Sequence, residues 1–249
     1  VDYTAAISKT ATHADDHARF AEDMDLVDND VNTFIEGMPA FGGFVGGTNT
    51  SSILPCDATV TVDTSNNIRT LTITYNGNVC APNQRFIRTG SVVMAAPMRN
   101  HFRDSGAVMS ITMNNLQITR LADTTTMTFN GSKSITNVTG GSMMNLPNLG
   151  SIIHEMRTGV SGITVTFPDG TSRNWNVARR RTYTFSTGVV ISTTGLHTIG
   201  ATTGVSEWGT DRFGNAFQTS IDQPLVNRQD CDFRLVSGQV TNQIGRAHV

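Results

Sequence analysis

The chain has 249 residues and a mass of 26.8 kDa, and it combines a net charge of −2 with a charged fraction of only 15%. This length can bury a substantial core without a metal or prosthetic group, and all-β sandwiches and barrels often reach it as one unit. The sequence has no run of about eighteen uncharged apolar residues, as a membrane-spanning helix needs, and its weak charge argues against nucleic acid as a partner.

Charge is unevenly distributed along the chain. Residues 1–36 carry nine acidic and two basic residues, a net −7, which leaves +5 for the remainder. Oppositely charged parts of one chain can dock on each other or on a neighbouring copy, and the sequence leaves both alternatives open. Thr, Asn, Ser and 23 Gly fill the other polar positions, and the only lysines are Lys9 and Lys133, a composition typical of extracellular β proteins.

Residues 10–36 predict an amphipathic helix, because apolar or aromatic side chains recur at spacings of three and four. Thr10 or Thr12 is the expected N-cap, and Gly37 is the expected end. A lone helix of this length is marginal in water, so its stripe must be covered by the chain's own sheet, which we favour, or by another subunit. The stripe consists of His17, Phe20, Met24, Val27, Val31 and Phe34.

A Gly-rich connection follows the helix. Residues 39–52 read PAFGGFVGGTNTSS and can act as a flexible arm. From Ile53 onward the hydrophobic period changes to two, which is typical of strands. We therefore predict two parts, a helix with its arm at 1–52 and a β domain at 53–249.

The β domain is predicted from alternating segments separated by turn residues. ATVTVD and RTLTITY flank the turn at 64–67, and GITVTF and TSRNWNVARRRTYTF flank the Pro-Asp-Gly turn at 168–170. Many short strands of this kind indicate a mainly β fold, an antiparallel β-sandwich or jelly-roll-like body. Further strand candidates are GSVVMAA, GAVMSITMNNLQITR, TTTMTF, GVVIST, NAFQTSI and FRLVSGQV.

Cys56 and Cys80 bracket the first hairpin. The Asn76-Gly77 turn can bring Cys80 back towards Cys56, so a disulfide is geometrically reasonable. Such a bond would stabilise the fold by roughly 3–4 kcal/mol and would persist in an oxidising compartment, whereas the alternative is unpaired thiols in a cytosolic protein. Cys231 is left over, and we expect it to be a small buried hydrophobic residue.

Several segments, taken in order, resemble a family of surface lipoproteins from Bacteroidetes whose function is uncharacterised. The resemblance spans most of the chain and implies an exported β protein at the cell surface or outer membrane, with Cys56 and Cys80 bonded. Any membrane anchor would lie upstream of Val1, and the resemblance supplies no catalytic residue. After the acidic helix, the matching segments are PCDATVTVD, NIRTLTITYNGNVCAPNQRFIRTGSVVM, FRDSGAVMSITMNNLQIT, SKSITNVTG, TFPDGTSRNW and IDQPLVNRQDCDFRLVSGQV.

Proteins exported in this phylum can carry O-glycans at an Asp followed by Ser or Thr and then by a small aliphatic residue or Thr. Asp123-Thr124-Thr125 resembles this motif, which makes Thr124 a candidate O-glycosylation site. The alternative is an ordinary Thr-rich strand edge.

Signals for chemistry are weak. His13 and His17 are spaced to share a metal on one helical face, but no third ligand accompanies them. Glu155 and Glu207 are the only glutamates of the β domain, and they could act as a glycosidase pair only if folding brought them within about 5–10 Å. We assign no catalytic residue, metal or cofactor.

The run WNVARRRTYTF places three arginines among aromatic residues. Strand alternation puts Arg179 and Arg181 on one face with Trp175 and Tyr183, and Arg180 on the other. Such a narrow basic stripe suits a solvated strand or a patch for the acidic helix better than nucleic acid.

Aromatic residues also suggest a ligand. Trp175, Trp208 and Tyr183 are candidates for stacking on sugar rings, although most of the few aromatics are needed in the core.

The sequence as a whole favours a non-enzymatic exported structural protein at the cell surface, such as a self-assembling filament or surface-layer subunit. Its expected partners are copies of itself, contacted through the N-terminal helix and arm. The alternative is a module that binds a glycan or another surface polymer, and a glycoside hydrolase comes third.

Overall fold

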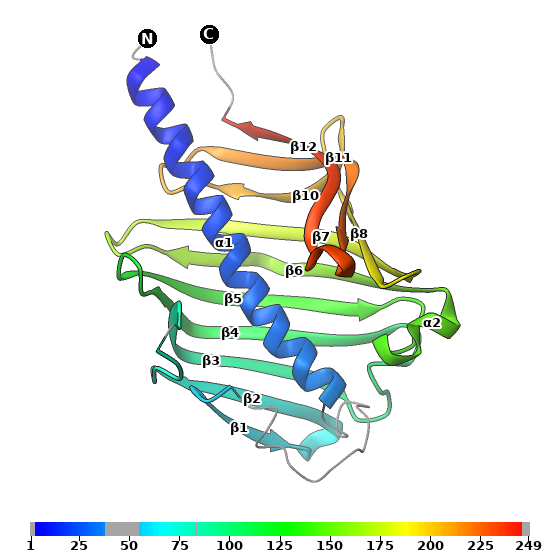
Figure 1. Cartoon of the computed structure of the whole chain (residues 1–249). Helices are drawn as coiled ribbons and strands as arrows, with labels where there is room; N and C mark the ends of the chain where they lie inside the picture. The colour runs from blue at the N-terminus through cyan, green and yellow to red at the C-terminus, as the bar shows by residue number, and fades with distance from the viewer. Residues whose placement is uncertain (1–2, 38–54, 83, 246–249) are drawn as a thin grey trace.

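The computed structural model describes residues 3–37, 55–82 and 84–245. In this part of the chain, one long helix lies across a single 12-stranded antiparallel sheet (Figure 1). The helices and strands are α1 (Tyr3–Gly37), β1 (Ala58–Asp63), β2 (Ile68–Asn76), β3 (Phe86–Pro97), β4 (Ala107–Arg120), β5 (Thr125–Asn137), α2 (Leu146–Leu149), β6 (Ser151–Thr166), β7 (Ser172–Phe185), β8 (Val189–Gly195), β9 (His197–Ile199), β10 (Thr202–Thr210), β11 (Ala216–Arg228) and β12 (Arg234–Ile244).

Helix α1 begins earlier than predicted. It starts at Tyr3, and Thr12 is no cap, because its hydroxyl donates to the Ser8 carbonyl oxygen one turn back, at 3.0 Å. The segment before Thr10 contains two alanines, the best helix former, so the helix extends beyond its apolar stripe. Ile7 in this extension is 70% exposed.

Strands β1 to β8 form a meander in which each strand pairs with the next. The predicted first turn is confirmed: the Asp63 carboxylate accepts the Ser65 backbone N–H at 2.8 Å, and Asn66 and Asn67 both have a φ of 58°. Asp, Ser and Asn favour such turns because their side chains bond the local backbone and Asn tolerates positive φ. This hairpin pairs Ala58 with Tyr75 and so fixes which side chains of β1 and β2 face the helix.

The order changes at the C-terminal end of the sheet. Strand β7 pairs with β8 through Arg179–Phe185 and with β10 through Asn174–Val177, and β11 pairs with both β8 and β10. These four strands therefore close a small ring. A Cβ at Gly195 would overlap the backbone of Gly204, so only glycine allows β8 and β10 to approach this closely.

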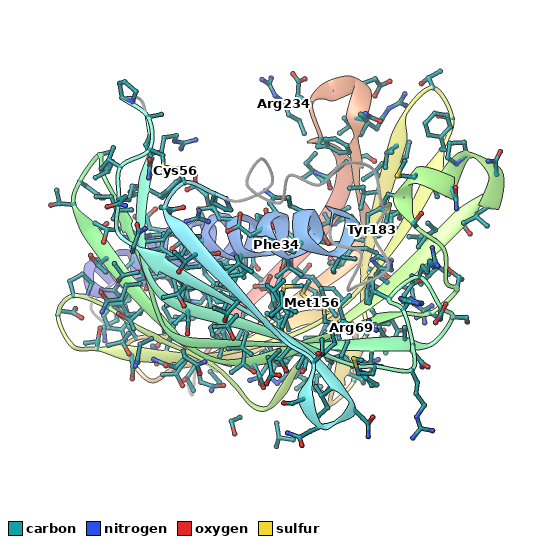
Figure 2. All side chains as sticks on the ribbon, turned by 90° about the horizontal axis from the view of Figure 1, so that it is seen from below. Phe34, Cys56, Arg69, Met156, Tyr183 and Arg234 are labelled. Atoms are coloured by element: carbon teal, nitrogen blue, oxygen red, sulfur yellow. A yellow bond between two sulfur atoms is a disulfide. The ribbon has the colours of Figure 1, made fainter. Side chains whose placement is uncertain are left out.

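The mainly β antiparallel body with an N-terminal helix is confirmed, but the predicted sandwich is wrong in one respect. The layer that covers the apolar face of the sheet is α1 rather than a second sheet. Figure 2 shows the sheet curving around the helix, with Phe34 on the helix and Cys56 and Arg234 on opposite rims. Alternation predicts that one face of each strand is buried, but it does not identify the covering layer.

Helix and sheet share one core. The side chains of α1 in this core are Phe20, Met24, Val27, Val31, Phe34 and Ile35, and they pack against apolar residues of β2 to β7 and β11. A smaller cluster of Leu146, Ile152 and Tyr183 lies beside α2. The outer face of the sheet, away from α1, carries mainly Thr, Ser and Asn, as the alternation of the strands requires.

Candidate functional site: the helix groove, the β12 edge and the hollow at Trp208

The helix groove, meaning the concave face of the sheet that holds α1, is closed by apolar contacts. Phe20 stacks on Trp175 with ring centroids 3.7 Å apart, and Phe34 and Val31 are fully buried. Each fully buried side chain of this size contributes about 1.5–3 kcal/mol. The stripe of α1 therefore packs on its own sheet, which confirms the favoured alternative.

Ion pairs then join the acidic helix to the basic body. Their partners are mostly shielded from water, which makes correct pairing more important than at an open surface. The charge asymmetry of the sequence is thus satisfied within one chain. The pairs are Asp16–Arg212 at 2.6 Å, Asp30–Arg88 at 2.7 Å, Asp25–Arg181 at 3.7 Å and the buried Asp28–Lys133.

The pair at Asp30 belongs to a network beside the disulfide. Arg88 donates two hydrogen bonds to the Asp57 carboxylate, at 2.9 and 2.7 Å, and a third to Asp30 at 2.7 Å. The Tyr75 hydroxyl donates to the same Asp30 oxygen, and the guanidinium lies 4.3 Å from the Tyr75 ring centroid. A bidentate fork of this kind fixes geometry as well as charge, so it ties the C-terminal half of α1 to β1, β2 and β3.

A histidine cluster lies under the N-terminal half of α1. His17 Nε2 is 2.8 Å from Glu207 Oε2, and Glu207 also pairs with Arg179. Burial, followed by the positive charge of Arg179, lowers the pKa of His17 to about 4. Burial, followed by Arg173, lowers the pKa of His13 to about 4, so both imidazoles are neutral at pH 7.

Arg173 is the most unusual side chain of this cluster. It is 2% exposed, and its guanidinium nitrogens have no hydrogen-bond partner in the described structure. The guanidinium instead lies 3.7 Å from the centroid of Trp175 and 4.7 Å from that of Phe217. Burial lowers the pKa of Arg173 to about 10, and cation–π contact with two rings offsets part of the desolvation cost.

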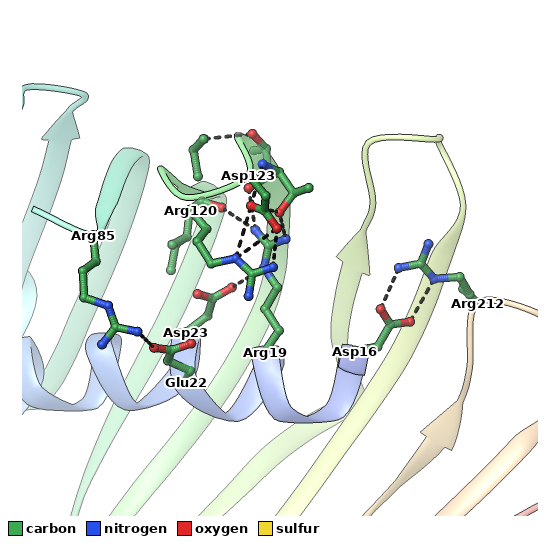
Figure 3. Close-up of polar contacts among 12 residues, drawn as sticks. Asp16, Arg19, Glu22, Asp23, Arg85, Arg120, Asp123 and Arg212 are labelled. Carbon is green, nitrogen blue, oxygen red and sulfur yellow. Dashed lines mark hydrogen bonds and ion pairs between the residues drawn. The ribbon is translucent and has the colours of Figure 1, made fainter. Parts of the chain in front are cut away.

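A charged cleft of about 580 Å³ opens where α1 crosses the β4–β5 and β6–β7 turns (Figure 3). Its arginines are paired: Arg212 donates to Asp16, and Arg120 pairs with Asp123. Arg19 donates to the Thr125 carbonyl oxygen at 2.6 Å. Because its three arginines are already engaged, the cleft holds the helix to the sheet and offers no unpaired arginine to a ligand.

Asp23 borders this cleft and is fully buried. Neither carboxylate oxygen has a hydrogen-bond partner in the described structure, and the nearest cation is Arg19, whose Nε lies 3.7 Å away. Burial raises the pKa of Asp23 to about 7. Asp23 therefore titrates near neutral pH inside the helix–sheet interface.

The structure does not bring the candidate catalytic carboxylates together. The Glu155 carboxylate accepts a hydrogen bond from Arg180 at 2.6 Å on the outer face of the sheet. Glu207, by contrast, lies in the helix groove with 1% of its surface exposed. Strand alternation separates them because the neighbours of Glu155 on β6 face the helix. Two carboxyl groups on opposite faces of one sheet cannot flank one glycosidic bond, so the condition for a glycosidase pair is not met by these two glutamates.

The candidate metal pair also finds no third ligand. Among the described residues, no group of three or more His, Cys, Asp and Glu side chains is placed to hold a metal ion. The centroids of the His13 and His17 rings lie 6.3 Å apart, and each ring packs on an aromatic side chain of the sheet.

The arginine run confirms the predicted alternation. Arg179 and Arg181 face the helix, where they pair with Glu207 and with Asp25, and Arg180 faces outward to Glu155. The basic stripe is therefore a docking patch for the acidic helix.

Two of the three candidate sugar-stacking aromatics were wrong. Trp175 is completely buried between β7 and α1, and Tyr183 packs with Leu146 and Ile152 in the smaller cluster. Both lie on strand faces that are covered, Trp175 by the helix and Tyr183 by α2, so neither presents an exposed ring for a sugar to stack on. Trp208 alone stays half-exposed.

Trp208 lies on the outer face of the sheet. It pairs with Asn176 and Gln218, while the preceding Glu207 points into the groove. His197 stacks on the indole, with centroids 3.9 Å apart and an interplanar angle of 15°. Trp208 lines a hollow of about 480 Å³ between β9, β10, β11 and the end of β12.

The cysteines differ in their outcome. A disulfide joins Cys56 and Cys80 across a Cα–Cα distance of 5.8 Å, as predicted. Cys231 is exposed in the turn between β11 and β12 rather than buried, because the turn and the strand that follows it both lie open to solvent. Thr124 is exposed in the β4–β5 turn with a φ of 56°, which leaves O-glycosylation at this position sterically open.

Strand β12 forms an open edge. It pairs with β11, and no described strand pairs with its other side. Ten of its 11 residues are exposed, among them Leu235 at 58%, Val236 at 45% and Val240 at 42%. Arg234 is its one charged residue. Charged residues, which usually protect an edge strand, are thus scarce here, although the pairing of β12 with β11 contains three register shifts.

In the described part of the chain, no helix has the length and apolar character needed to cross a bilayer. No protein-family model, curated protein or solved structure matches the chain.

Proposed function

We propose that the protein is a non-enzymatic exported structural subunit that assembles with copies of itself through the edges of its sheet. The observation that carries this proposal is the open edge of β12, an 11-residue strand that is almost entirely exposed and nearly uncharged. A row of unpaired backbone N–H and C=O groups is a template for another strand.

The edge at the opposite end of the sheet offers the complementary strand. β1 and β12 lie at opposite ends of the molecule in Figure 1. Val62 of β1 is 47% exposed and pairs with Leu71 on the helix side, and Val240 of β12 pairs with Ile221 on the same side. Pairing β12 of one copy with β1 of the next continues the sheet and is a heterologous contact, which yields filaments or rings.

Export to the cell surface is the second part of the proposal. The Cys56–Cys80 bond persists where the environment is oxidising, and the resemblance to Bacteroidetes surface lipoproteins points to the same location. Thr124, exposed in its turn, would carry an O-glycan there. Mass spectrometry of the protein from its native host, before and after β-elimination, tests the glycan, and an unmodified Thr124 would exclude it.

Edge substitutions test the assembly. Val240→Lys and Val62→Lys place a charge on each edge, and each is expected to convert polymers into monomers by light scattering and negative-stain imaging. Val160→Lys is the matched control, because Val160 is fully exposed in β6 away from both edges. Assembly that survives Val240→Lys, or a wild-type protein that is monomeric at every concentration, would contradict the proposal.

A second route to assembly uses α1. The Gly-rich connection at 39–52 lies outside the described residues, but its length in sequence would let the helix of one copy fill the groove of another. Complementation separates this route from the edges. Asp16→Arg and Arg212→Asp each break the same ion pair, and helix exchange predicts that only their mixture assembles, whereas edge pairing predicts no gain on mixing.

A further inference from the structure

The hollow at Trp208 has the chemistry of a carbohydrate site, and we propose that it binds a neutral oligosaccharide. Trp208 supplies an indole whose ring is backed by His197, and a supported aromatic surface is what the C–H face of a pyranose ring packs on. The volume of about 480 Å³ lies within the range of small-ligand pockets, about 300–1,000 Å³.

Polar groups with unused hydrogen-bonding capacity surround the indole. Gln218 donates to the Gln243 side chain at 2.7 Å and lies 3.4 Å from the Thr202 hydroxyl. An amide has two donors and two acceptor lone pairs, so this chain of three side chains retains donors and acceptors for sugar hydroxyls. Adjacent donors and acceptors suit hydroxyl groups, which both donate and accept.

The composition of the hollow selects a neutral ligand. None of the described residues that line it carries a charge, in contrast to the charged cleft beside α1, where arginines and aspartates alternate. A phosphate or uronate would lose its hydration here without gaining an opposite charge, which is unfavourable. Glycines at 200, 209 and 245 keep the walls low and allow the backbone to approach a bound ring.

This site shares the end of β12 with the proposed assembly contact, but it lies on the other face of the sheet from Val240. Gln243 pairs with Gln218 on the outer face of the sheet, whereas Val240 lies on the helix face. The monomeric Val240→Lys variant therefore retains the hollow, and its sugar binding can be measured without polymers. Failure of assembly and failure of sugar binding are thus distinguishable.

Intrinsic fluorescence gives a direct test, because the chain has two tryptophans and Trp175 is buried. We expect at least one of cellohexaose, maltohexaose, chitohexaose and mannohexaose to change the emission and to give a Kd in the micromolar to millimolar range by calorimetry, for wild type and for Val240→Lys. Trp208→Phe should remove the emission change, and Trp208→Ala should weaken binding about tenfold or more.

Controls keep the result interpretable. Gln218→Ala removes the central amide and should weaken binding with the indole in place, and thermal unfolding of each variant shows that it is folded. Absence of binding by every member of the panel at millimolar concentration overturns the proposal. Undiminished binding by folded Trp208→Ala, or tighter binding of hexagalacturonate than of the neutral panel, overturns it equally.

Discussion

The helix groove and the C-terminal edge of the sheet use the same chain in opposite ways. In the groove, apolar side chains are buried and acidic residues of α1 meet basic residues of the strands. At β12, apolar side chains such as Leu235 and Val240 stand in solvent, and the backbone on the outer side of the strand pairs with no described strand. The groove is occupied by the chain itself, so surfaces for other molecules lie elsewhere.

This difference changes how the charge asymmetry is understood. An acidic helix and a basic body suggest attraction between copies, but nine residues from α1 and the β body already pair with one another within one chain. Strand β12, nearly uncharged, has no such partner. A surface for another molecule is therefore better sought among exposed residues such as those of β12. Charge patterning alone points instead to the helix groove, which the chain itself fills.

The same substitution should have very different effects in the two regions. Phe34 is fully buried in the groove, and Phe233 is 45% exposed just before β12. Phe34→Ala should lower the free energy of unfolding by about 3–5 kcal/mol, since it leaves a cavity. Phe233→Ala should change it by less than about 0.5 kcal/mol in urea denaturation. Equal losses would show that the edge is as tightly packed as the groove.

Cysteines provide a second matched pair. Replacing Cys56 and Cys80 by Ser opens a link between residues 24 apart and should cost about 3 kcal/mol of stability, because the unfolded chain regains freedom. Cys231→Ser, in the exposed turn before β12, should leave stability unchanged. Reduction of the wild type with dithiothreitol should reproduce the double variant; a wild type insensitive to reductant would mean that the bond contributes nothing.

The groove was more predictable from the sequence than the edge. The spacing of Phe20, Met24 and Val27, four and then three residues apart, predicts which face of the helix is covered. The alternation of side chains along a strand predicts that Arg179 and Arg181 share a face. Predictions of this kind depend only on the sequence within a few turns or a few strand residues of each position. They gave the helix, the first hairpin and the Cys56–Cys80 pair.

What depends on distant pairing was missed. The sandwich was wrong because alternation cannot tell whether a helix or a sheet covers a strand, and Trp175 and Trp208 look alike in sequence although only Trp175 lies under α1. Strand β10 and the first half of β6 escaped prediction because charged residues such as Glu155 and Glu207 interrupt their apolar pattern. The open edge of β12 follows from strand order, which no local pattern contains.

The smallest expected effect is on the pH dependence of stability, and it distinguishes groups within the groove. His13 and His17 have pKa values lowered to about 4, below the unfolded value of 6.5, so the unfolded chain binds more protons between these pH values. Stability should therefore fall as pH drops from 6.5 to 4, by on the order of 1–2 kcal/mol per histidine, discounted for the partial exposure of His17. Urea denaturation at pH 7 and pH 4.5 measures it.

Asp23 acts in the opposite direction. Its pKa is raised to about 7, so the folded protein holds this proton more tightly than the unfolded chain, and the contribution of Asp23 to stability declines as pH rises through 7. His17→Gln should flatten the acid loss, whereas Asp23→Asn should stabilise the protein by about 1 kcal/mol at pH 8 and by less at pH 6. Phe233→Ala, outside the groove, should retain the wild-type profile. If all three variants follow that profile, these buried groups do not govern how tightly α1 is held.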